Sequence, residues 1–109
     1  MSFDMNKMLQ EAQRMQAELA KAQAEAATEI VEASAGGGMV TVQANGAGEV
    51  VAITIDPRAI DPDDPELLAD LVLAAVNEAL RSGRALMESK MSGLIPGGLG
   101  DLGGLLPGA

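Results

Sequence analysis

The sequence predicts an α/β protein of the α+β type, in which a helix, a three-stranded antiparallel meander and a second helix follow in that order. Three patterns lead to this prediction. Apolar residues recur every three or four positions near the N-terminus, alternate with polar residues in the middle of the chain, and form a broad helical stripe after residue 66. The 109 residues suffice for one small domain, which we place at residues 1–92.

The first helix is expected over residues 4–27. Its apolar positions step by three and four residues and form a seam of heptad type, which consists of Met5, Met8, Ala12, Met15, Leu19, Ala22 and Ala26. Strong helix formers fill this segment, and neither glycine nor proline occurs before Gly36. Because the seam is built from methionine and alanine, it favours packing against another helix or sheet over a self-sufficient coiled coil.

Residues 28–34, 39–44 and 49–56 are expected to form the three strands, since they are short apolar runs separated by glycine-rich turns at 36–38 and 45–48. Apolar and polar residues alternate in the second and third of them. The side chains expected on the buried face are Val40, Val42, Ala44, Val51, Ile53 and Ile55. Consecutive strands with short connections are typical of an antiparallel meander.

Residues 56–66 are too rich in proline and aspartate for a strand or a helix. Their aspartates lack the regular spacing and the glycine of a calcium-binding loop, so we interpret them as residues that lead into the second helix. Asp63 or Asp64 can cap that helix, and Pro65 suits its first turn.

The second helix is expected to end near residue 91, with Gly83 as a weak point inside it. Its broad apolar face consists of Leu67, Leu68, Leu71, Val72, Ala75, Val76, Ala79 and Leu80. Residues 93–109 contain mainly glycine, leucine and proline and carry one charged side chain, Asp101. This composition predicts a disordered or loosely attached tail.

Composition excludes several classes of function. The chain has neither cysteine nor histidine, and none of its serines stands beside a plausible base. We therefore expect no enzyme, no metal, no cofactor and no small-molecule substrate. The chain also lacks a signal peptide and an apolar run long enough to span a membrane, so we expect a cytoplasmic location and no membrane contact. Because the chain has only one aromatic residue for its core and no disulfide, we expect it to gain stability by forming a homodimer.

The charge balance is acidic, with a formal net charge of −9 that opposes nonspecific binding to a polyanion. Six of the seven cations lie on the predicted helices: Lys7, Arg14, Lys21, Arg81, Arg84 and Lys90. Carboxylates one turn away accompany most of them, and each such pair contributes about 0.2–0.5 kcal/mol to an isolated helix. Judged from the residues alone, the cations of both predicted helices are expected to lie on solvated helix faces whose charges neutralise one another, and not on a phosphate-binding surface.

Three segments in a fixed order carry a resemblance to a known family. They are "EAQRMQAEL" at 11–19, "VTVQANGAGEVVAITIDP" at 40–57 and "LLADLVLAAVNEAL" at 67–80. Together they resemble the YbaB/EbfC family of bacterial nucleoid-associated proteins, over about residues 3–97. The resemblance implies homodimers likened to tweezers, whose protruding helices clasp double-stranded DNA in the nucleoid. It also implies roles in chromosome organisation and gene regulation, without enzymatic activity.

The resemblance makes the six helical cations named above the DNA-binding candidates. A second hypothesis is a protein-interaction module that uses the apolar seam and the leucine-rich tail. Such a module would act beside DNA repair or replication proteins without binding DNA directly, and the acidic net charge favours it. Binding of the purified protein to plain duplex DNA distinguishes the two hypotheses.

Overall fold

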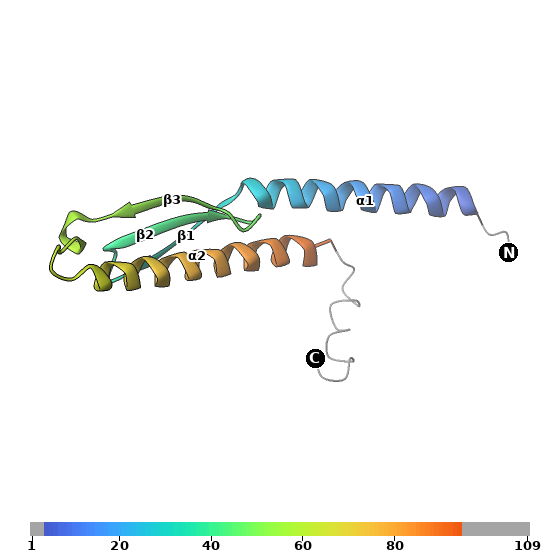
Figure 1. Ribbon diagram of the computed structural model, residues 1–109. Helices are drawn as coiled ribbons and strands as arrows, with labels where there is room; N and C mark the ends of the chain where they lie inside the picture. Colours follow the sequence, from blue (N-terminus) through green and yellow to red (C-terminus); the bar gives the residue numbers. More distant parts are fainter. Residues whose placement is uncertain (1–3, 95–109) are drawn as a thin grey trace, which may run out of the picture.

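The computed structural model describes residues 4–94, which form two long helices and one sheet (Figure 1). In chain order the elements are α1 (Met5–Thr28), β1 (Ile30–Ala35), β2 (Val40–Asn45), β3 (Val50–Ile55), the 3₁₀ turn η1 (Pro57–Ala59) and α2 (Pro65–Ser92). The sheet has the order β1-β2-β3, and both pairings are antiparallel. The predicted helix–meander–helix fold is therefore confirmed, while residues 95–109 of the tail predicted at 93–109 lie outside the described residues.

The hydrophobic core lies between α2 and one face of the sheet, chiefly over β1 and β2. Its buried members are small, and they are Ala33, Val40, Val42, Ala44, Ala75 and Ala79. Val40 and Val42 have no exposed surface, as the alternation in β2 predicts. Because alanines line the contact, the helix and the sheet approach closely without aromatic side chains.

The prediction that Val51 and Ile53 are buried is wrong. Val51 is 49% exposed and Ile53 is 46% exposed, and only Ile55 is partly buried against the core. The register places Ile53 beside buried Val42, so its side chain is on the expected face. It is exposed because α2 covers β1 and β2 and hardly reaches β3, which is an edge strand.

Only the C-terminal part of α1 is packed. Ala22 and Ala26 are buried, whereas Met5, Met8 and Met15 are 63%, 55% and 48% exposed. Figure 1 shows that the N-terminal part of α1 projects past the end of α2. We call residues 5–18 the arm.

Gly83 is a site of close contact, and its prediction as a weak point in α2 is wrong. It is buried, and a Cβ at this position would lie 2.4 Å from the backbone oxygen of Asn45. At Gly46 a Cβ would lie 2.3 Å from the oxygen of Ala26, and the Gly46 N–H donates to that oxygen at 3.0 Å. The two glycines thus let α1, the β2–β3 turn and α2 meet, which fixes the start of the arm.

The acidic loop leads into α2 as predicted. The Asp64 carboxylate accepts from the Leu67 N–H at 3.2 Å, and Pro65 begins the helix. Asp56 caps η1 by accepting from the Arg58 N–H at 2.9 Å. The loop aspartates therefore satisfy backbone donors, in agreement with their interpretation as helix-entry residues.

Candidate nucleic-acid interface

Three of the candidate cations lie in one row on α1. Asp4 caps the helix, since its carboxylate accepts from the Lys7 N–H at 3.1 Å, and the helix runs without interruption from Met5 to Thr28. Lys7, Arg14 and Lys21 are exposed and follow one another at intervals of about 10 Å along the axis. Two of them lie on the arm, and the third lies where the arm meets the body of the protein.

The predicted ladder of ion pairs on α1 is absent. Residues 4–94 contain salt bridges between Arg58 and Asp56, Arg81 and Glu78, and Lys90 and Glu29. None of them involves a cation of α1. The physical reason is that an exposed pair gains little Coulomb energy in water and costs side-chain entropy, so the long side chains extend into solvent.

The arm nevertheless carries side chains of both charges close together. Lys7, Gln10, Glu11 and Arg14 line a shallow surface hollow of about 320 Å³. The two cations at its ends are free to bind an anion, while the Glu11 carboxylate beside them repels one. The two cations would therefore attract an anionic partner, while the neighbouring carboxylate would weaken its binding.

The cations of α2 differ from one another. Arg81 is paired with Glu78, as expected for a surface pair. The Lys90 ammonium lies 3.2 Å from the Glu29 carboxylate, so it ties the end of α2 to the segment between α1 and β1. Arg84 is exposed, and residues 4–94 place no carboxylate within salt-bridge distance of it.

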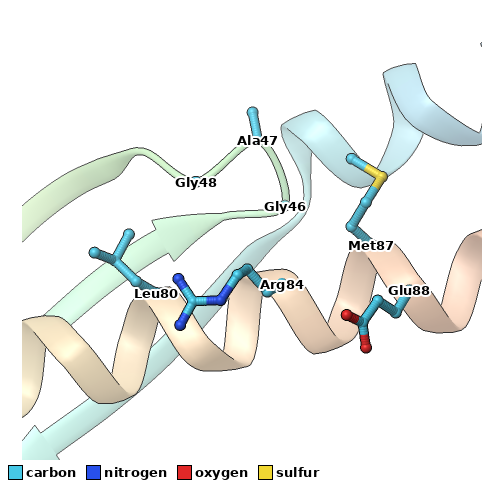
Figure 2. Close-up of a pocket in the computed structure, with 7 residues that line it drawn as sticks. All are labelled: Gly46, Ala47, Gly48, Leu80, Arg84, Met87 and Glu88. Carbon is cyan, nitrogen blue, oxygen red and sulfur yellow. The ribbon is translucent and has the colours of Figure 1, made fainter. Parts of the chain in front are cut away.

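Arg84 borders a hollow of about 400 Å³ between α2 and the β2–β3 turn (Figure 2). The other lining residues are Gly46, Ala47, Gly48, Leu80, Met87 and Glu88. Figure 2 shows the guanidinium directed along α2 toward Leu80, beside the glycine-rich turn. A planar guanidinium in this position can bind a phosphate through two parallel N–H groups.

Arg58 is the one cation that lies outside the predicted set, and the structure shows it engaged. Its guanidinium donates to the Asp56 carboxylate, with the shortest contact at 2.8 Å. This contact lowers the pKa of Asp56 below its ordinary value and raises that of Arg58. The unpaired cations of residues 4–94 are therefore Lys7, Arg14, Lys21 and Arg84.

Residues 4–94 offer neither a metal-binding cluster nor a membrane-spanning helix. The described residues hold no cluster of three acidic, histidine or cysteine side chains that could bind a metal ion. Neither helix in this range is long and apolar enough to cross a membrane.

The fold and these cations together define a small helix–sheet–helix protein with a projecting helix that carries unpaired positive charge, an arrangement that can contact a polyanion. Residues 1–99 match the model of the YbaB/EbfC DNA-binding family, and the chain belongs to this family. The resemblance seen in the sequence is thus confirmed.

Curated relatives support the same assignment. The chain is 50% identical to a nucleoid-associated protein of Streptomyces avermitilis, in an alignment that covers 96% of this chain and 90% of the relative. It is 48% identical to a nucleoid-associated protein of Acetivibrio thermocellus, with 94% and 89% covered. The crystal structure of an uncharacterized protein from Helicobacter pylori shares the fold, with a TM-score of 0.67 at 24% identity, and covers 81% of this chain and 92% of that one.

Proposed function

We propose that this chain is a nucleoid-associated protein that binds double-stranded DNA as a homodimer and acts in chromosome organisation and gene regulation, without catalysing a reaction. Membership of a DNA-binding family and the names of its relatives support the proposal. The structural observation that carries it is the unpaired state of Lys7 and Arg14 on a helix that projects from the body.

The proposed mechanism is contact with the DNA backbone. Lys7, Arg14, Lys21 and Arg84 would displace counterions from phosphates, which supplies sequence-independent affinity. Arg81 and Lys90 remain candidates, but each must first leave a carboxylate partner. The net charge of −9 and the carboxylates of the arm oppose the approach of DNA, so affinity should be modest and fall steeply with salt.

The proposed homodimer has a candidate interface along β3. This edge strand leaves backbone groups unpaired, and its Val50, Val51 and Ile53 are 38%, 49% and 46% exposed. Leu73 is 60% exposed and lies two helical turns before Leu80, on the flank of α2 that faces the β2–β3 turn. A second copy bound along this edge would pair the backbone of β3 and cover these side chains.

A pair of single substitutions tests this interface. Ile53→Lys should convert the dimer to a monomer, whereas Thr54→Lys, on the opposite face of the same strand, should leave it dimeric. Sedimentation equilibrium at several concentrations gives the mass of each variant. A native chain that sediments as a monomer at every concentration would refute the homodimer.

DNA binding is tested by fluorescence anisotropy with a labelled duplex, measured from low to physiological salt. The double variant Lys7→Gln, Arg14→Gln should bind more weakly, and in a dimer the slope of log K against log salt should fall by up to about 4. The matched control is Glu11→Gln, Glu18→Gln, which removes negative charge from the same helix and should bind more tightly. Circular dichroism shows whether both variants keep their helix.

A second comparison concerns α2. Arg84→Gln should weaken binding more than Arg81→Gln, since Arg81 is already paired with Glu78. If neither the double variant Lys7→Gln, Arg14→Gln nor these two variants of α2 change the affinity for DNA, the assignment of these cations to DNA binding is wrong. If the native dimer binds no duplex even at low salt, direct DNA binding is refuted and the protein-interaction hypothesis stands.

A further inference from the structure

The apolar seam of α1 changes from covered to open along one helix. At its C-terminal end, Ala22 is 7% exposed and Ala26 is fully buried. Towards the N-terminus, Met15, Met8 and Met5 lie on the same helical stripe but are about half exposed or more. The open part of the seam is therefore a continuation of a packed surface, and it begins where α2 ends (Figure 1).

The chain itself leaves α2 at this point. The helix ends at Ser92, and Leu94 lines a hollow of about 240 Å³ with side chains of α1. The other lining residues are Glu18, Lys21, Ala22 and Glu25. The last described residue of the chain is thus an apolar side chain at the border between the covered seam and the open seam.

The following residues, 95–109, have a composition that suits this surface. They include Ile95, Leu99, Leu102, Leu105 and Leu106, and Asp101 is their one charged side chain. Fully extended, 15 residues span at most about 50 Å. The seam from Ala22 to Met5 is about 26 Å long, so the segment reaches its far end with half its length.

We propose that residues 95–109 bind along the open seam of their own α1 and cover Met5, Met8 and Met15. Methionine is flexible and polarizable, so it adapts to leucines presented by an irregular glycine- and proline-rich chain. The row formed by Lys7, Arg14 and Lys21 lies about 100° or more around the helix from the seam. A bound segment therefore leaves Lys7 and Arg14 open, while Lys21 lines the hollow that Leu94 borders, so covering the seam and binding DNA through the arm are separable.

The test measures how fast hydrogen peroxide oxidises each methionine in the full chain, by peptide mass spectrometry. Replacement of Leu99, Leu102, Leu105 and Leu106 by serine should raise the oxidation rates of Met5, Met8 and Met15 several-fold. The rates of Met39 and Met87 should stay unchanged, because Met39 lies in the turn between β1 and β2, and Met87 lines the hollow between α2 and the β2–β3 turn. The matched control replaces Gly97, Gly98, Gly103 and Gly104 by serine and should leave every rate unchanged.

Two outcomes of the oxidation experiment would overturn the proposal. Equal oxidation rates in the native chain and the leucine variant would show that the segment does not cover the seam. Protection that disappears on dilution would assign the cover to a second copy instead of the same chain. In the reverse direction, Met8→Ser, Met15→Ser should speed chymotrypsin cleavage after the tail leucines, and unchanged cleavage would also count against the proposal.

Discussion

Within α1, residues 19–28 pack against α2 and the β2–β3 turn, whereas residues 5–18 project past the end of α2 (Figure 1). The apolar seam runs through both parts with the same spacing. Ala26 on one side of the boundary is fully buried, and Met8 on the other is 55% exposed. Periodicity therefore identifies the helix face that suits burial, but the position of the neighbouring helix decides where burial occurs.

The two parts also differ in what their stability depends on. An isolated helix of about 14 residues is marginal in water, so the arm depends on its capping residue and on helix propensity. The packed part depends on backbones that approach too closely to admit a Cβ at Gly46 and Gly83. Three pairs of variants and one single variant sharpen or break this contrast, and they are given in order of decreasing effect.

Gly83→Ala should have the largest effect, lowering the free energy of unfolding by about 3 kcal/mol because the new Cβ meets the Asn45 backbone oxygen. In an isolated helix the same change would stabilise by about 1 kcal/mol, so the sign is diagnostic. Gly93→Ala is the control, since a Cβ there has ordinary contacts at 3.6 Å. Urea unfolding at fixed protein concentration measures both, and a stabilised Gly83→Ala would contradict the close contact.

Ala26→Leu should lower the free energy of unfolding by about 2 kcal/mol, since Ala26 has no exposed surface and its Cβ faces Gly46. Ala12→Leu makes the same change at an exposed position of the same seam and should stay within about 0.5 kcal/mol. Thermal unfolding followed by circular dichroism compares the two. Equal losses of stability for the two variants would mean that the arm is packed as tightly as the rest of α1.

Asp4→Ala removes the cap of the arm and should cost about 1 kcal/mol locally, which frays the first turn without lowering the midpoint of global unfolding. Asp64→Ala removes the equivalent cap of α2 and should lower the free energy of global unfolding by a similar amount, since α2 forms half of the core. Hydrogen exchange of the Met8 and Leu9 amides reports the first effect, and urea unfolding reports the second. A global loss with Asp4→Ala would contradict an independent arm.

The smallest effect is expected in the exposed loop before α2. Arg58→Gln should raise the pKa of Asp56 toward its ordinary value, because the guanidinium that lowers it is removed. Because the pKa of Asp56 is lowered in the folded state, the ionised carboxylate stabilises the fold at pH values above the ordinary carboxyl pKa of about 4. This stabilisation is lost as the pH falls from about 4 through the pKa of the folded state. NMR titration of the Asp56 carboxyl carbon in the native chain and in the variant measures the shift. An unchanged midpoint would rule out the pair in solution.

Much of the fold was predictable from local patterns. The heptad steps of α1, the alternation in β2 and the Asp64–Pro65 start of α2 are properties of neighbouring residues, and the structure confirms each of them. The errors concern distant contacts. Ile53 is on the predicted face but exposed, because no local pattern shows that α2 stops short of β3, and Val51 lies at an irregularity in the register where Val50 takes the place opposite Ala44.

The candidate site was predictable only as a set of cations. Sequence spacing suggested that Lys7 and Arg14 pair with their helical neighbours, but the structure leaves them unpaired. Spacing also could not show that Lys90 contacts Glu29, which belongs to another part of the chain. The glycine at position 83 gave a signal, since such a residue inside an apolar helix often marks close packing, but its partner at Asn45 is 38 residues away.

The sequence by itself determined which segments are helices and strands, which helix face is apolar, and that the chain is acidic with few cations. These properties follow from interactions between side chains and backbone groups within a few positions of one another in the chain. Only the tertiary structure decided which half of α1 is packed, that β3 is left uncovered, and which cations stay unpaired. Those outcomes depend on where α2 lies relative to the sheet, because burial and ion pairing require groups that are distant in the chain to meet.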